Sequence, residues 1–99
     1  MIVRRYELSA HEWRILEQSA DGGVAQDGEF VRCGGEAVHG AVVDLLNMGV
    51  LERRASSAQY RPAKLGRAML RQGRDGGRVV LEFTGSEWKL ADPERGEAR

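Results

Sequence analysis

Apolar residues recur every three or four positions in three segments of the chain, which is the spacing of a helix with one buried face. The first segment, residues 10–20, starts with a capping box, in which Ser9 is the N-cap and Glu12 follows three positions later. Gly22 and Gly23 come after the segment and predict its end. The predicted inner face of this helix carries Trp13, Leu16 and Ala20.

The other two predicted helices are residues 36–48 and 64–72. The glycine pair Gly34-Gly35 is predicted to open the first of them, and Gly73 is predicted to end the second. At 100° per residue, one side of the helix 36–48 carries Val38, Val42, Leu45, Leu46 and Gly49. The inner side of the helix 64–72 carries Leu65, Ala68 and Met69.

Elsewhere, β-forming and alternating residues predict one short edge strand and three β-hairpins. Asp27-Gly28 is a strong signal for a two-residue turn in the first hairpin. Pro62 is predicted to end the second hairpin, because proline has no backbone N–H to donate. The edge strand is predicted over residues 2–6, and the hairpins over residues 24–33, 50–61 and 79–90.

A chain of 99 residues with 41% apolar side chains suits a single domain. The order of elements predicts an α+β fold with three helices, a β-wing at residues 50–61 and an additional C-terminal β-hairpin. This domain is predicted to cover residues 1–91. Residues 92–99 are predicted to form a flexible tail, because they contain no apolar side chain larger than Ala.

About a third of the chain, residues 36–71, carries a family resemblance. The runs Ala41–Arg54 and Gly66–Leu70, with Tyr60-Arg61 between them, resemble bacterial winged-helix transcription factors of the MarR and PadR groups, and a phage regulator of this type fits as well. The resemblance implies an amphipathic recognition helix that ends in glycine, then a basic wing, and therefore binding to double-stranded DNA. It also implies a homodimer, because such regulators usually bind paired half-sites.

Two features differ from the family pattern. Pro62-Ala63 stand where the family usually has Leu-Thr, so the third helix lacks an N-cap hydroxyl. A hairpin, and not a helix, is predicted over residues 24–33, ahead of the recognition helix.

The formal net charge is zero, but the basic residues are concentrated in one segment. Residues 53–78 contain eight Arg or Lys and one acid, Asp75, whereas residues 1–52 contain four Arg and nine acids. Basic side chains contact phosphates without reading base sequence, and an amide side chain suits a base edge. The predicted nucleic-acid contacts are Asn47, Arg53, Arg54, Arg61, Lys64, Arg67 and Arg71.

Two other interpretations of these charges remain open. The basic segment can be a solvated surface paired with the acidic half of the chain. Alternatively, the domain binds a protein, as a phage-type inhibitor or an adaptor does. The outer face of the helix 36–48 favours this interpretation, because it is acidic and has no Arg or Lys. That face carries Glu36, Gly40, Val43, Asp44 and Asn47.

The C-terminal hairpin is a candidate surface for a homodimer or a partner. Its apolar set is larger than one short hairpin needs, and Val80, Phe83 and Trp88 are the predicted contacts. The alternative is that these residues cover the helices of the same domain.

Little in the sequence points to catalysis. Cys33, His11 and His39 are the only material for a nucleophile and a base, and no phosphate loop, Gly-x-Ser-x-Gly motif or metal-ligand pair is present. We therefore expect no enzyme activity, no cofactor and no metal. Cys33 is interpreted as a small buried residue, with a redox sensor as the alternative. A lone cysteine and the lack of an apolar run of membrane-spanning length predict a cytoplasmic protein with no membrane contact.

Overall fold

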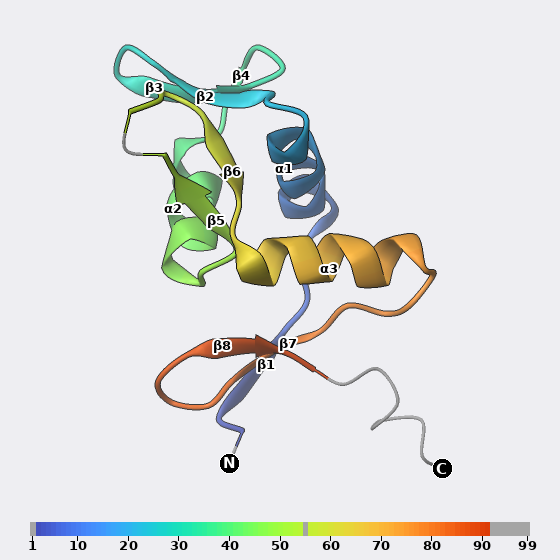
Figure 1. Cartoon of the computed structure of the whole chain (residues 1–99). Helices are drawn as coiled ribbons and strands as arrows, with labels where there is room; N and C mark the ends of the chain where they lie inside the picture. The colour runs from blue at the N-terminus through green and yellow to red at the C-terminus, as the bar shows by residue number, and fades with distance from the viewer. Residues whose placement is uncertain (1, 55, 92–99) are drawn as a thin grey trace.

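A computed structural model of the chain describes residues 2–54 and 56–91, and over these residues it shows an α+β fold of three helices and three antiparallel sheets (Figure 1). The helices are α1 (Ala10–Ala20), α2 (His39–Asn47) and α3 (Lys64–Arg74). The strands are β1 (Arg4–Tyr6), β2 (Val24–Asp27), β3 (Phe30–Cys33), β4 (Glu36–Ala37), β5 (Leu51–Arg53), β6 (Tyr60–Pro62), β7 (Leu81–Phe83) and β8 (Trp88–Leu90). The predicted tail, residues 92–99, lies outside the described residues.

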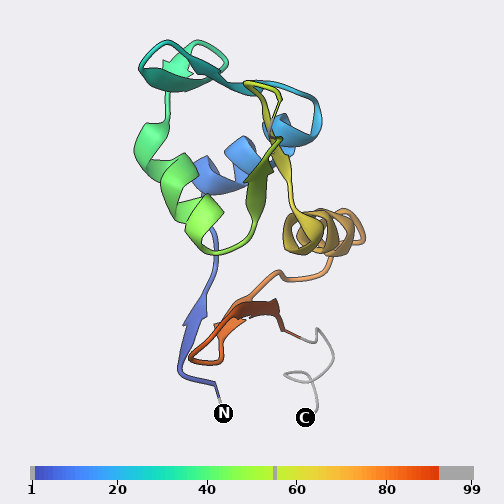
Figure 2. The ribbon, with the colours of Figure 1, turned by 60° about the vertical axis from the view of Figure 1, so that its left-hand side comes forward.

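The three sheets are arranged around the helices. The sheet β2-β3-β4 and the sheet β1-β7-β8 lie at opposite ends of the molecule, with the helices between them (Figures 1 and 2). The hairpin β5-β6 lies beside α2 and leads directly into α3 (Figure 1). Within the described ranges, no helix has the length and apolar character that crossing a membrane requires.

The capping box at the start of α1 is confirmed. The Ser9 hydroxyl accepts a hydrogen bond from the Glu12 backbone N–H at 3.1 Å, and Glu12 Oε1 accepts one from the Ser9 backbone N–H at 2.9 Å. These two bonds satisfy backbone donors that a helix otherwise leaves unpaired.

The predicted inner face of α1 is partly wrong. Leu16 is fully buried as expected, but Trp13 is only half-buried and Ala20 is exposed. Ile15 and Ser19 take the inner positions instead. The reason is that α1 packs against β6 and both other helices, and these contacts bury a different face of the helix from the predicted one. The Ser19 hydroxyl donates to the Leu16 carbonyl at 2.6 Å. This buried polar group therefore has the hydrogen-bond partner that burial requires.

The predicted start of the second helix is wrong. Glu36 and Ala37 form β4, which pairs with β3, and α2 begins only at His39. The glycine pair makes the turn between β3 and β4, with φ of 58° at Gly34 and 86° at Gly35. Two successive residues with positive φ reverse the chain into an antiparallel hairpin, so they do not open a helix here.

The inner face of α2 agrees with the prediction except at Gly49, which is exposed and lies beyond the helix end. Val38, Val42 and Leu45 are buried in the core and Leu46 is half-buried against it. Gly49 ends the helix with φ of 79°, a conformation that glycine adopts at little cost. These side chains join α2 to the rest of a core that includes Leu16, Val24, Val31, Leu51, Met69 and Leu81.

The predicted end of the third helix is also wrong, because α3 continues past Gly73 to Arg74. Gly73 lies inside the helix, where an added Cβ would come within 2.8 Å of the Trp13 ring. Its missing side chain therefore makes room for Trp13, and Gly76, with φ of 84°, follows the helix end instead. Gly66 and Met69 are the buried residues of α3, whereas Leu65 and Ala68 are half-buried.

Strands β5 and β6 pair as the predicted second hairpin requires. Pro62 ends β6 as predicted, although it belongs to the strand itself and stands opposite Leu51. The hairpin also touches β2, since the Gln26 N–H donates to the Ala58 carbonyl and the Tyr60 hydroxyl donates to Gln26 Oε1 at 3.0 Å.

The predicted N-terminal edge strand and the C-terminal hairpin belong to one sheet. β1 pairs with β7, with Tyr6 opposite Leu81, and β7 pairs with β8, with Phe83 opposite Trp88. Leu81 is fully buried in the core, so this sheet is anchored to the helices through its central strand.

Candidate functional site

Three of the predicted basic residues converge on one hollow of about 430 Å³ beside α3. Arg67 and Arg71 come from α3, and Arg61 comes from β6 just before it. A fourth arginine, Arg74, was not among the predicted contacts. We call this hollow the arginine groove, and its floor is formed by Ala20, Pro62 and Leu70.

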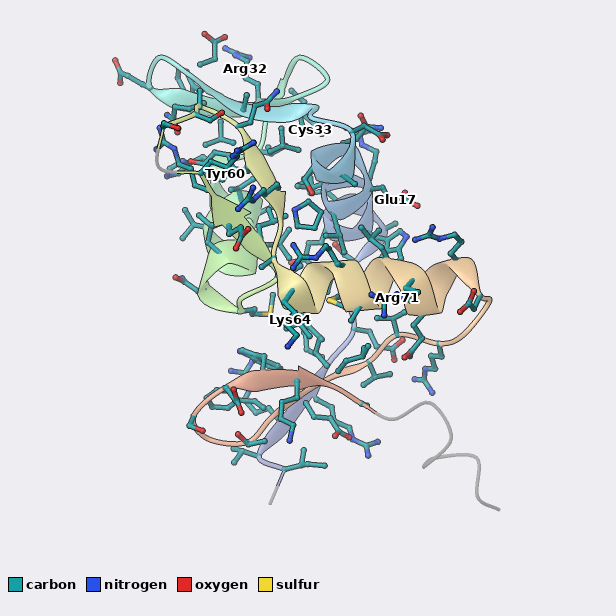
Figure 3. All side chains as sticks on the ribbon, viewed as in Figure 1. Glu17, Arg32, Cys33, Tyr60, Lys64 and Arg71 are labelled. Atoms are coloured by element: carbon teal, nitrogen blue, oxygen red, sulfur yellow. The ribbon has the colours of Figure 1, made fainter. Side chains whose placement is uncertain are left out.

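Helix geometry explains why these arginines share a surface. Arg67, Arg71 and Arg74 are spaced by four and three residues, which places them on one face of α3. This spacing was available from the sequence and would have added Arg74 to the predicted set. Lys64 stands seven residues before Arg71 on the same helix, and Figure 3 shows both labelled on α3.

Two of the four arginines are held in place by neighbours. Arg67 Nη1 donates to the Pro62 carbonyl at 3.1 Å, and Arg61 Nε lies 2.6 Å from Glu52 Oε2 in an exposed ion pair. The guanidinium groups of Arg71 and Arg74 make no hydrogen bond or ion pair with other residues in the described part of the chain. No carboxylate is among the described residues that line the groove.

The other two predicted arginines lie at the far end of the hairpin β5-β6. Arg53 pairs with Tyr60, and its guanidinium carbon lies 5.7 Å from the centre of the Tyr60 ring. Arg53 Nε also approaches the Ser57 carbonyl at 3.4 Å, a long contact. Arg54 follows β5 and is exposed. The predicted basic surface therefore divides into the arginine groove and this hairpin end.

Asn47 does not join either group. It lies at the end of α2 in a separate cleft of about 350 Å³, with Asp44 on the same helix and Tyr6 and Trp88 from the sheet β1-β7-β8. We call this hollow the sheet cleft. Its residues come from three distant parts of the sequence.

The outer face of α2 contains no basic side chain other than His39. Its exposed residues are His39, Gly40, Val43, Asp44 and Asn47. Glu36, which was predicted on this face, lies in β4 and forms an ion pair with Arg14 at 2.8 Å. One carboxylate, Asp44, therefore remains on the helix face itself.

The predicted dimer surface is partly occupied by neighbours within the chain. Val80, Phe83 and Trp88 are all half-buried. The Phe83 and Trp88 rings are 5.1 Å apart, and Trp88 also meets the Tyr6 ring edge-on at 6.4 Å. The homodimer stays a prediction.

Other candidate chemistry is limited. Cys33 is fully buried in the core and His39 is exposed at the start of α2. Within residues 2–54 and 56–91, no group of three or more His, Cys, Asp or Glu side chains is arranged to hold a metal ion.

Comparisons of the chain with protein-family models, with curated proteins and with solved structures gave no significant match. The resemblance to the MarR and PadR groups therefore stays a prediction from the sequence pattern.

Proposed function

We propose that this chain binds double-stranded DNA through its phosphate backbone, using the arginine groove as the main contact. The observation that carries the proposal is the convergence of four arginines on one groove without a carboxylate among its described lining residues; of the four, Arg61 alone has an acidic partner, Glu52, among the described residues. Like charges gathered on one surface repel each other, and a row of phosphates neutralises them with release of bound counterions.

The end of the hairpin β5-β6 offers a second basic surface, separate from the groove. Arg53 and Arg54 are exposed there, in the position of the wing in the winged-helix interpretation. Together with Lys64 at the start of α3 they add three basic residues outside the groove. A backbone-binding protein needs several such contacts, because each phosphate contact adds affinity.

The proposal gives α2 no major role in reading bases. In a winged helix of the MarR or PadR type this helix would enter the major groove, but its exposed face carries Asp44 and offers only Asn47 as a suitable base contact. In addition, the three strands β2, β3 and β4 stand between α1 and α2, where a helix-turn-helix has a helix. We therefore expect weak discrimination between DNA sequences.

Binding can be measured by fluorescence anisotropy with a labelled duplex of random sequence, over a series of salt concentrations. We compare the wild type with the double variant Arg71→Gln and Arg74→Gln. These side chains have no partner within the described residues, so their removal should leave the fold intact. The matched control is Arg14→Gln with Arg32→Gln, which removes the same charge from exposed ion pairs on other surfaces.

We expect the groove variant to bind more weakly and its slope of log affinity against log salt to fall by about two, close to one for each lost phosphate contact. The control variant should retain the wild-type slope. If the two variants lose equal affinity, net charge alone drives binding and the arginine groove has no special role. If the wild type fails to bind DNA at roughly 50 mM salt, the proposal is wrong.

A protein partner is the second candidate, and the apolar floor of the groove favours it. Ala20 and Leu70 continue into a neighbouring hollow that is lined by Trp13, so an apolar strip runs between α1 and α3 beside the arginines. An acidic amphipathic helix would place carboxylates on the arginines and apolar side chains on this strip. Competition between the labelled duplex and a synthetic peptide of that kind, with and without Leu70→Gln, separates the two candidates. Only peptide binding should depend on Leu70.

A further inference from the structure

The sheet cleft is lined by residues of β1 and β8 and by residues of α1 and α2 or next to them. Figure 1 shows the sheet β1-β7-β8 beyond the adjacent ends of these two helices. Two carboxylates line it, Glu12 from α1 and Asp44 from α2, together with the rings of Tyr6 and Trp88. The Met48 side chain and the Arg4 guanidinium complete much of its wall. It is separate from the arginine groove, with which it shares no lining residue.

The unusual group in this cleft is Glu12. Its exposed fraction is only 9%, and Oε1 accepts hydrogen bonds from the Tyr6 hydroxyl at 2.6 Å and the Ser9 N–H at 2.9 Å. Among the described residues, Oε2 has no hydrogen-bond partner and no Lys, Arg or His nitrogen lies within ion-pair distance of this carboxylate. Oε2 is not enclosed by the protein, because no buried side-chain oxygen or nitrogen of the described residues lacks a hydrogen-bond partner, so this oxygen is open to a ligand.

Asp44 adds a second negative charge to the same wall. Within the described part of the chain it forms no ion pair either, although Arg4 lines the same cleft. The Arg4 guanidinium instead lies over the Trp88 ring, with its central carbon 5.5 Å from the ring centre. The cleft therefore holds two carboxylates and one guanidinium, and its negative charge is not balanced from within.

The aromatic walls suit a cation as well. The Tyr6 and Trp88 rings meet edge-on at 6.4 Å, and the Arg4 contact shows that the Trp88 ring accepts a guanidinium on its face. The Tyr6 hydroxyl keeps its proton and serves as a donor, since its hydrogen bond to Glu12 and its burial raise the pKa of Tyr6 to about 12. Glu12 is thus left as the acceptor that faces any occupant.

We infer that the sheet cleft binds a guanidinium or primary ammonium group on an apolar stem. Such a group meets Glu12 Oε2 and Asp44 with its charge and Trp88 and Met48 with its stem. A volume of about 350 Å³ holds one side chain of this size. An anion would be repelled by both carboxylates, and an uncharged apolar ligand would bury Glu12 Oε2 without a partner. The cation belongs either to a free amine or to an Arg or Lys side chain of a partner.

The test uses the full-length chain with Trp13→Phe, so that Trp88 is the one remaining tryptophan and its fluorescence reports on the cleft. The probes are butylguanidinium and its uncharged analogue butylurea, titrated at constant ionic strength. Butylguanidinium should change the Trp88 emission with a saturable curve, and butylurea should not. Equal binding of the two probes, or no saturable binding of butylguanidinium, would overturn the inference.

Substitutions then locate the site. Asp44→Asn should weaken butylguanidinium binding by roughly tenfold, as expected for the loss of a charged hydrogen-bond acceptor. The matched control is Glu17→Gln, because Glu17 is an exposed carboxylate on α1 outside the cleft. Thermal unfolding should show that both variants remain folded. An Asp44→Asn variant that is folded and binds as well as the control would place the cation elsewhere and contradict the inference.

The source of the cation is distinguished with a second probe, the tripeptide acetyl-Gly-Arg-Gly-amide. Tighter binding of the tripeptide than of butylguanidinium would indicate a side chain of a protein partner, since its backbone then contributes. Tighter binding of butylguanidinium would indicate a free amine. This result does not depend on DNA binding, because no residue of the arginine groove takes part.

Discussion

Gly66 lies near the start of α3, where the helix backbone passes close to the strand that follows α2. An added Cβ at this position would clash with the Val50 carbonyl oxygen and come within 3.1 Å of Leu16. The backbone oxygen cannot move aside alone, because it also accepts the hydrogen bond of the Ala63 N–H. Glycine at position 66 is therefore a requirement of packing.

We expect Gly66→Ala to lower the free energy of unfolding by about 1–3 kcal/mol, the usual cost of an overpacked core. Gly40→Ala is the matched control, because Gly40 lies in α2 and an added Cβ there meets nothing within 4 Å. That change should leave stability unaltered or raise it by up to about 1 kcal/mol through better helix propensity. Urea denaturation measures both, and a neutral Gly66→Ala would show that α3 can shift away.

A second prediction concerns pH and Tyr6. The pKa of Tyr6 rises from 10.0 to about 12 in the folded chain, first because its hydroxyl donates to Glu12 and then because of burial. Above its unfolded pKa the unfolded chain loses this proton while the folded chain keeps it. The contribution of Tyr6 to stability is thus complete below pH 10 and is lost as the pH rises toward 12.

The variant Tyr6→Phe tests this sign. The difference in free energy of unfolding between wild type and Tyr6→Phe should be largest below pH 10 and should shrink from there to about pH 12. Other groups that titrate in this range cancel in the difference. A constant difference over the whole range would mean that the Tyr6 hydroxyl has the same pKa in the folded and unfolded chain.

At the scale of elements, α1 is the helix with the clearest local start signal. Replacing Ser9 with Ala removes the hydroxyl that accepts the Glu12 N–H, and we expect a loss of about 1 kcal/mol in the free energy of unfolding. Ser86→Ala, in the exposed turn of the C-terminal hairpin, is the control and should change little. A Ser9→Ala variant with an unchanged melting temperature would show that the cap adds nothing to stability.

Elements set by local chemistry could be predicted from the sequence. The capping box placed α1, and Asp27-Gly28 located the first hairpin, because both signals act within a few residues. The turn itself is one residue later than predicted, at Gly28-Glu29, since Asp27 belongs to β2 and pairs with Phe30. The start of α2 was missed because Gly34-Gly35 is compatible with a helix start and with a hairpin turn. Only the pairing of β4 with β3 decides between them.

The inner face of α1 and the sheet cleft depend on tertiary packing. The periodicity of α1 allows several faces, and its contacts with β6 and the other helices select the one with Ile15. The two candidate sites differ in the same way, because one follows from a local pattern and the other from tertiary packing. The arginine groove could be predicted from the spacing along α3, whereas the sheet cleft joins β1, α2 and β8, which no local pattern relates.

At the scale of the whole molecule, the open prediction is the homodimer. We expect it to form through the C-terminal sheet, so sedimentation should show a concentration-dependent mass. Because Phe83 and Trp88 already pack on each other, changing both to Ser should also lower the free energy of unfolding of the monomer. A wild type that stays monomeric at high concentration would contradict the dimer, and DNA binding would then involve one arginine groove per particle.

The pairing of β1 with β7 has a consequence for the order of folding. Residue 6 stands opposite residue 81, so β1 is synthesised long before the strand with which it pairs. Contacts between such distant residues form slowly, because the entropy cost of closing a long loop comes before the favourable contacts are made. The helices, the sheet β2-β3-β4 and the hairpin β5-β6 can assemble on a ribosome-bound chain. The sheet β1-β7-β8 can form only when β7 and β8 have emerged from the exit tunnel. Nascent chains halted before β7 should therefore remain sensitive to proteases near their N-terminus.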